Sequence, residues 1–246
     1  MDRLTGIHAV KEALESGRAL ERIVIARGRH GDRMEEIVAR ARERGVPVRF
    51  EERSQLDRLA GGSQHQGIVA LTSAKQAGSL EDILVASSRS DRPGILVLLD
   101  GVEDPHNLGA ILRSALAAGA AAVIVPERRA AGLGDTVARA AAGALEHIPV
   151  ARVVNIARAM EDLKKAGYWL VGLDERAERE VSAVDLTGAI GLVLGGEGGG
   201  LHELVRKRCD FLASIPTTGP VRSLNVSVAA GIVLFEAVRQ RRAKAR

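Results

Sequence analysis

Short, uninterrupted runs of apolar residues recur from residue 94 onward, and this pattern is the strongest constraint on the fold. Residues 95–99, 121–125, 169–173 and 190–194 are such runs, each too short for a typical helix. Strands buried on both faces of a parallel sheet have this composition. Because segments with helical spacing lie between the runs, we predict an α/β domain with a mainly parallel sheet. The other expected elements are strands over 22–26, 46–50, 66–71 and 211–215, and helices over 7–14, 32–44, 54–59, 79–84, 105–118, 135–145, 156–166 and 224–242.

The pattern divides the chain into three parts. Residues 1–75 mix short strands and helices and predict a small α/β unit. Residues 76–93 are more polar and end in Pro93-Gly94, which is typical of a linker, although 79–84 could form one helix. Residues 94–246 hold the larger α/β domain.

Composition excludes several classes of protein. No apolar run approaches the roughly 20 residues of a membrane-spanning helix, and the first residues lack the hydrophobic region of a signal peptide. Cys209 is the only cysteine, so neither an intrachain disulfide nor a cysteine metal cluster can form. The six histidines show no metal-ligand spacing. We therefore expect a cytoplasmic protein that uses no metal and no membrane.

Arginine dominates the basic residues, since 29 of the 35 lysines and arginines are arginine. Arginine binds phosphate with two parallel hydrogen bonds, which fits a nucleic-acid partner, although a GC-rich genome would also favour it. The chain has only three phenylalanines, one tryptophan and one tyrosine. This scarcity argues against recognition mainly by base stacking.

Three segments that follow expected strands carry polar or glycine-rich sequence, and the first of them spans residues 100–113. Asp104 and Pro105 are suited to the N-cap and first position of a helix. Asn107 and Arg113 lie about 120° apart around such a helix, so they converge only if Asn107 is at a frayed start. The plainer interpretation of Arg113 alone is a helical arginine that is solvated or paired with a carboxylate.

The second segment, residues 195–201, places Glu197 among five glycines. Glycine lets the backbone approach a ligand closely, but the segment lacks the Lys-Ser/Thr of a P-loop and the spacing of a dinucleotide fingerprint. An acid in the loop also disfavours bound phosphate, whereas a buried Glu197 would need a cation or hydroxyl partner. The plainer alternative is a mobile glycine turn.

The third segment, residues 215–228, is a loop with two prolines that opens into a helix. Ser223 is a candidate N-cap, with Asn225 in the first turn, and free backbone N–H groups at that end. The plainer alternative is helix capping without any other role.

Together these segments resemble the three motifs, in order, of the SpoU/TrmH class of RNA 2′-O-ribose methyltransferases. The motifs here are Asn-Leu-Gly-x-x-x-Arg, Gly-Gly-Glu-Gly-x-Gly-Leu and Ile-Pro followed by Ser-Leu-Asn-Val-Ser-Val-Ala, and the resemblance covers residues 95 to about 241. Gly-Ile-His-Ala-Val at 6–10 and His-Gln-Gly-Ile-Val-Ala at 65–70 are similar to the small substrate-binding domain of the RlmB branch, which has a fold like a ribosomal RNA-binding protein.

The resemblance implies a SPOUT fold with a C-terminal trefoil knot, an exception to the rule that chains are unknotted. It implies a homodimer with the site near its interface, and methyl transfer from S-adenosylmethionine to the ribose 2′-OH of a guanosine in large-subunit (23S) rRNA. The residues that match the cofactor-binding positions, largely through backbone, are Leu194, Gly195, Ile215 and Leu224. The residues that match the catalytic polar positions are Asn107, Arg113, Glu197, Ser223 and Asn225.

Roles for the polar residues follow from the chemistry. The family's general base matches Arg113, but free arginine has a pKa above 12, so Arg113 could instead position the ribose or its 3′ phosphate. We assign Glu197 to orienting Arg113 or the loop, and Asn107 and Asn225 to holding ribose and backbone. Two alternatives are a tRNA ribose 2′-O-methyltransferase and a non-catalytic RNA-binding or ribosome-assembly factor. The separate N-terminal domain disfavours a tRNA ribose methyltransferase. The presence of all five polar site residues disfavours a non-catalytic factor.

Overall fold

The computed structural model describes residues 2–62, 64–72, 78–89, 94–220 and 223–245. The described chain divides by its contacts into two compact units. The first comprises residues 1–76 and 132–147, and the second comprises residues 77–131 and 148–246. Part of the expected linker, residues 76–77 and 90–93, lies outside the described residues.

The first unit has a sheet in the order β1-β4-β2-β3, in which β4 is antiparallel to both β1 and β2 and β3 is parallel to β2. Its elements are β1 (Asp2–Thr5), α1 (Ile7–Glu15), β2 (Leu20–Ala26), α2 (Asp32–Glu43), β3 (Val48–Glu51), α3 (Arg53–Ala60), β4 (Ile68–Thr72), α6 (Asp135–Ala140) and α7 (Ala144–His147). Apolar side chains such as Ile23, Ile37 and Ile68 are fully buried between sheet and helices. The helix α6 joins this unit because Asp135 accepts hydrogen bonds of 3.2 Å from the backbone and hydroxyl of Thr5.

The single helix expected over 135–145 is wrong, since the chain forms two short helices there. Ala142 has φ 48° and Gly143 has φ 90°, and both values belong to the left-handed region that interrupts a right-handed helix. The alanine-rich composition predicted helix but did not reveal this break. The strand β1 was also not expected, because four residues are too short to show alternation.

The second unit is built on a sheet in which every described strand is parallel to its neighbours, in the order β10-β8-β9-β5-β6-β7. Its elements are α4 (Leu80–Ser88), β5 (Ile95–Asp100), α5 (Pro105–Ala117), β6 (Ala122–Pro126), β7 (Val150–Val153), α8 (Ile156–Lys165), β8 (Trp169–Leu173), η1 (Val181–Ala183), β9 (Ile190–Gly195), α9 (Glu203–Arg208), β10 (Phe211–Ala213) and α10 (Val226–Lys244). The predicted parallel α/β class is confirmed, while the short elements β7 and α9 were not foreseen.

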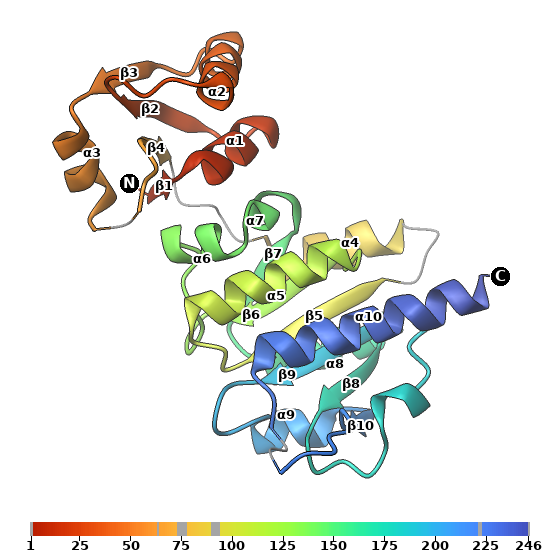
Figure 1. The fold of residues 1–246 in the computed structure, drawn as a ribbon. Helices are drawn as coiled ribbons and strands as arrows, with labels where there is room; N and C mark the ends of the chain where they lie inside the picture. Colours follow the sequence, from red (N-terminus) through yellow and green to blue (C-terminus); the bar gives the residue numbers. More distant parts are fainter. Residues whose placement is uncertain (1, 63, 73–77, 90–93, 221–222, 246) are drawn as a thin grey trace. The chain divides into compact units, whose positions relative to one another are not determined.

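Helices cover both faces of this sheet, which explains why its central strands are apolar throughout. Residues of α4, α8 and α9, including Ile83, Met160 and Val205, share one core cluster with β5, β6, β8 and β9. The helices α5 and α10 lie side by side on the other face (Figure 1). The helix α4 falls within the expected linker, and it is held by a capping box between Ser79 and Asp82. No helix in the described ranges is long and apolar enough to cross a membrane.

The strand order indicates where on the sheet a ligand-binding site is expected. The chain enters at the central β5, continues to β6 and β7 on one side, and returns to β8, β9 and β10 on the other. Ligands of such sheets bind at the carboxyl ends of the strands where this direction reverses. Here that point lies between β5 and β9, where Asp100 is in register with Gly195. The trefoil knot that the resemblance implies stays a prediction.

Candidate active site

Three polar side chains from three different segments form one hydrogen-bonded group. Asn107 of α5 donates from Nδ2 to Glu197 Oε1 over 2.7 Å. Asn225, next to α10, donates from Nδ2 to Asn107 Oδ1 over 2.9 Å and to Glu197 Oε1 over 3.0 Å. The structure therefore brings together one residue from each of the three sequence motifs.

Asn225 is also the N-cap of α10, and this fixes the orientation of its side-chain amide. Its Oδ1 accepts hydrogen bonds from the backbone of Ser227 and Val228 and so caps α10. The amide nitrogen must then point the opposite way, toward Asn107 and Glu197. The prediction that Ser223 is the N-cap is wrong, because α10 begins only at Val226 and Asn225 is its cap. Both residues are good caps, so residue type alone could not choose between them. Asp104, in contrast, caps α5 as predicted, accepting from the backbone of His106.

At Gly195 and Gly196, the glycine loop that follows β9 approaches other backbone too closely for any side chain. A Cβ added to Gly195 would lie 2.0 Å from the carbonyl carbon of Gly200, and one added to Gly196 would lie 2.1 Å from the carbonyl oxygen of Gly101. The loop closes on itself through a hydrogen bond from Gly200 N to Gly196 O. The loop's course therefore depends on glycine at both positions.

Both ends of this loop are held by Asp100, the last residue of β5. Its backbone oxygen accepts from Gly196 N, and its buried carboxylate accepts from His202 N over 2.8 Å and contacts His202 Nδ1 at 3.0 Å. Sequence analysis did not single out Asp100. The sequence signal that could have identified it is an acid directly after the apolar run of residues 95–99.

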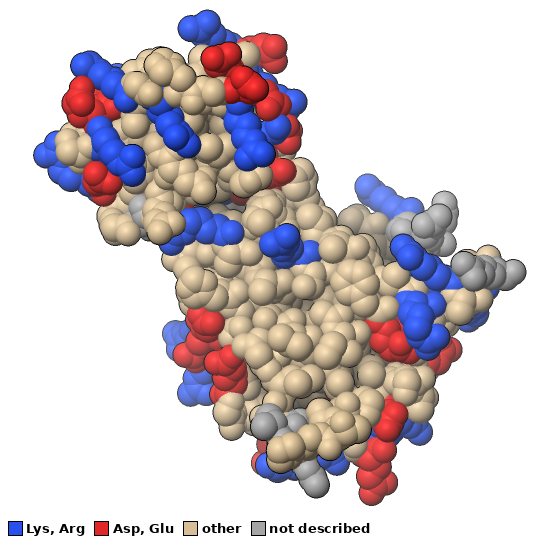
Figure 2. Space-filling view, viewed as in Figure 1, with Lys and Arg blue, Asp and Glu red and all other residues tan. Residues whose placement is uncertain are grey.

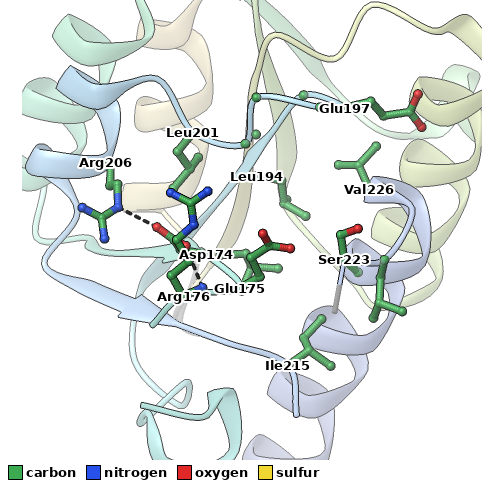
Figure 3. A pocket seen from close by; sticks show the side chains of 18 of the residues that line it. Asp174, Glu175, Arg176, Leu194, Glu197, Leu201, Arg206, Ile215, Ser223 and Val226 are labelled. Atoms are coloured by element: carbon green, nitrogen blue, oxygen red, sulfur yellow. Dashed lines mark hydrogen bonds and ion pairs between the residues drawn. The ribbon is translucent and has the colours of Figure 1, made fainter. Parts of the chain in front are cut away.

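A cavity of about 720 Å³ opens at the carboxyl ends of β8, β9 and β10, beside the start of α10. Figure 3 shows the aliphatic side chains of Leu194, Ile215 and Val226 on its walls. Glycines 195, 196 and 198–200 form another part of its lining. The volume lies in the range of cavities that bind cofactors and other small ligands.

A charged pair borders the same cavity. Asp174 accepts a hydrogen bond of 2.5 Å from Arg206 Nε and another from the backbone of Arg176. Burial raises the pKa of Asp174, but these hydrogen bonds, together with the positive charges of Arg206 and Arg176, outweigh it and hold the pKa below that of an ordinary aspartate. Sequence reasoning missed both Asp174 and Arg206, since their positions carry no motif.

The cavity gathers most of the residues that the sequence singled out, but not all. The predicted residues that line it are Leu194, Gly195, Glu197, Ile215, Ser223, Leu224 and Asn225. Asn107 reaches the cavity through its hydrogen bond to Glu197. Arg113 lies outside it, exposed on α5, and its side chain makes no hydrogen bond or ion pair with the residues that the structure describes. No group of three or more His, Cys, Asp or Glu side chains among those residues could hold a metal ion.

Family models match both parts of the chain. The SpoU rRNA Methylase family matches residues 94–235, and the RNA 2′-O ribose methyltransferase substrate-binding domain matches residues 3–77. The chain belongs to the SpoU rRNA methylase family. Its SpoU region contains every predicted site residue, from Asn107 to Asn225.

Curated relatives align over nearly the full chain. The 23S rRNA (guanosine-2′-O-)-methyltransferase RlmB of Pseudomonas putida is 45% identical, with 99% of this chain and 98% of the relative covered. The putative TrmH family tRNA/rRNA methyltransferase YacO of Bacillus subtilis is 41% identical, with 98% and 96% covered.

Solved structures of methyltransferases show the same fold. The methyltransferase AviRb from Streptomyces viridochromogenes in complex with AdoMet has a TM-score of 0.80 at 28% identity, covering 98% of this chain and 90% of that one. An AdoMet-bound rRNA methyltransferase from Sinorhizobium meliloti has a TM-score of 0.81 at 27% identity, covering 97% and 87%.

Proposed function

We propose that this SpoU protein transfers a methyl group from S-adenosylmethionine to the ribose 2′-OH of a guanosine in 23S rRNA. The observation that carries the proposal is the hydrogen-bonded group of Asn107, Glu197 and Asn225 at the edge of the cavity. The substrate class is supported by full-length relatives named as 23S rRNA guanosine-2′-O-methyltransferases.

The lining of the cavity fits S-adenosylmethionine, whose sulfonium and ammonium groups are positively charged. Among the residues that the structure describes, four acids line the cavity against two arginines, so a phosphate would meet repulsion from them. These acids are Asp174, Glu175, Glu197 and Glu203. The residues proposed to hold the cofactor, largely through backbone, are Leu194, Gly195, Ile215 and Leu224. When bound, the cofactor supplies an electrophilic methyl group.

The polar residues orient and activate the ribose. A 2′-OH is a poor nucleophile until its proton is removed or strongly hydrogen-bonded. Glu197 fixes the two asparagine amides through a single carboxylate oxygen, so Asn107 and Asn225 present a set orientation to the ribose. Arg113 positions the ribose or its 3′ phosphate. Ser223 lines the cavity. Because the leaving group is neutral, orientation supplies much of the catalysis.

A second copy of this chain is proposed to cover the exposed face of α10. Val228, Ile232 and Phe235 lie on one side of the helix at spacings of four and three residues, and their exposed fractions are 50%, 41% and 51%. Figure 2 shows the surface over α5 and α10 as mainly uncharged, with charged residues toward its edges. An apolar patch of this kind typically marks an interface, and a homodimer is its simplest symmetric form.

The dimer has a direct test in sedimentation or light scattering. Phe235→Glu places a charge in the proposed interface and is expected to shift the protein to the mass of one chain. Phe50→Glu is the matched control, since Phe50 is 50% exposed on β3 of the first unit. A monomeric wild type, or an unchanged mass for Phe235→Glu, contradicts the proposal.

The domain roles belong to the same proposal. Residues 1–75 bind the RNA, residues 94–246 carry the catalytic domain, and residues 76–93 connect the two, with α4 of this stretch packed in the core of the second unit. The matches at 3–77 and 94–235 support these roles. A ribosomal RNA substrate and a chain with a single cysteine both fit a cytoplasmic location.

Methyl transfer to bulk RNA tests the proposed function. RNA from a strain without this enzyme is incubated with the full-length protein and S-adenosylmethionine labelled on the methyl group, and the labelled nucleotide is mapped. We expect one 2′-O-methylguanosine in 23S rRNA. Label confined to tRNA would overturn the substrate assignment, and no label in any RNA would favour a non-catalytic role.

A further inference from the structure

A second, smaller hollow of about 270 Å³ adjoins the cofactor cavity and has no role in the proposed chemistry so far. The two share the glycine loop as a wall, since Gly196, Glu197, Gly199 and Gly200 line both. The smaller hollow also contacts Asp100 and Gly101 at the end of β5. It therefore lies where the strand order reverses, the place at which parallel α/β sheets bind ligands.

Two opposite charges line this hollow without neutralising each other. Glu103 follows β5 and Arg129 follows β6, and both side chains are exposed. Neither makes a hydrogen bond or an ion pair within the described part of the chain. Arg129 has φ 58°, a left-handed conformation that is uncommon for a residue with a side chain. The hollow thus offers a carboxylate acceptor and a planar, forked donor, and both are available to a ligand.

We propose that this hollow takes the guanine base of the target nucleoside, turned out of the RNA, and that Glu103 and Arg129 select it. The proposal rests on the methyl transfer proposed above. Guanine presents two adjacent donors, N1–H and the 2-amino group, which one carboxylate can accept together, and O6 and N7 accept from an arginine. Adenine presents a bare N1 to the carboxylate and is disfavoured. A phosphate is disfavoured as well, because Glu103 and Glu197 both face the hollow.

The shared wall connects base recognition to the reaction. A base in the smaller hollow leaves its ribose at the glycine loop, near Glu197 and the two asparagines that Glu197 holds. Enzymes that modify a base turn it out of the stack and recognise its pairing edge in a fitted pocket. The proposal extends this mode of recognition to a nucleotide that reacts at its ribose. Glu103 and Arg129 would thus be specificity-determining residues, and neither would touch the methyl group.

The experiment compares transcripts of the 23S region that carry guanosine or inosine at the mapped target, since inosine lacks the 2-amino group. We expect wild type to favour guanosine over inosine in kcat/KM by about tenfold or more. Glu103→Ala should lower kcat/KM for guanosine by about tenfold to a hundredfold, bring the guanosine-to-inosine ratio close to one, and leave S-adenosylmethionine affinity unchanged in calorimetry. Arg129→Ala should lower kcat/KM for both transcripts.

The loop that follows β6 and carries Arg129 also offers matched controls. Glu127→Ala and Arg128→Ala remove an exposed acid and an exposed base that do not line the hollow, and both should behave as wild type. If Glu103→Ala keeps the wild-type guanosine-to-inosine ratio, the base-binding assignment is overturned while the methyl transfer stands. If wild type methylates neither transcript nor bulk rRNA, the proposed function itself fails.

Discussion

Asn225 donates a 2.9 Å hydrogen bond to Asn107 across 118 residues of sequence, and the same amide nitrogen also reaches Glu197. One side chain thus caps α10 through its oxygen and joins the first and second motifs through its nitrogen. Because both ends of the amide are engaged, the start of α10 and the glycine loop are held in one arrangement.

Replacing Asn225 by alanine should separate these two contributions. The lost cap is expected to lower the free energy of unfolding by about 1 kcal/mol. Loss of the contacts to Asn107 and Glu197 is expected to lower methyl transfer by about a hundredfold through misplacement of the loop. Thermal unfolding and single-turnover methyl transfer measure the two effects.

Asn155→Ala is the matched control for this prediction. Asn155 caps α8 by the same kind of bond, accepting from the backbone of Arg158, but lies on no part of the cavity. It should lose similar stability and keep full activity. Equal activity in the two variants would show that Asn225 acts only as a cap.

The strands of the sheet follow from local signals in the sequence, whereas the contacts between the site residues do not. An apolar run such as residues 95–99 is a local signal, and it correctly predicted a buried strand. The contact between Asn107 and Asn225 depends on how two distant helices pack, so no local pattern could reveal it. The left-handed Ala142 and the choice of Asn225 over Ser223 as the cap were also decided by the folded surroundings.

Gly196→Ala should disrupt the loop, whereas Gly199→Ala should be tolerated. A Cβ at position 196 would meet the Gly101 carbonyl at 2.1 Å, but a Cβ at position 199 would meet nothing within 4 Å. Overpacking of this kind typically costs about 1–3 kcal/mol. Calorimetric titration with S-adenosylmethionine and thermal unfolding should show weakened binding and lower stability for Gly196→Ala alone. Equal behaviour of the two variants would contradict the role assigned to the close approach.

Arg113→Ala is expected to abolish methyl transfer while leaving S-adenosylmethionine affinity largely intact, because Arg113 lies outside the cofactor cavity. Calorimetry and transfer of labelled methyl to rRNA check the two parts separately. Arg158→Ala removes another exposed helical arginine, on α8, and should retain activity. Turnover near that of wild type in Arg113→Ala would reject its catalytic role.

Cys209 should resist alkylation in the folded protein. Burial raises the pKa of its thiol to about 12, with nearby charges contributing less. At pH 8 about one thiol in ten thousand is then ionised, and only the thiolate is nucleophilic. Mass spectrometry after iodoacetamide treatment should detect slow labelling in native protein and fast labelling after unfolding in urea. Equal rates in the two states would contradict the burial effect.

The close approach of Gly196 to Gly101 also ties the cavity to the middle of the sheet. The course of the loop depends on the end of β5, since Asp100 holds both ends of the loop and Gly101 bounds its path. A substitution that displaces the end of β5 therefore also reshapes the cavity, even though Asp100 and Gly101 do not line it.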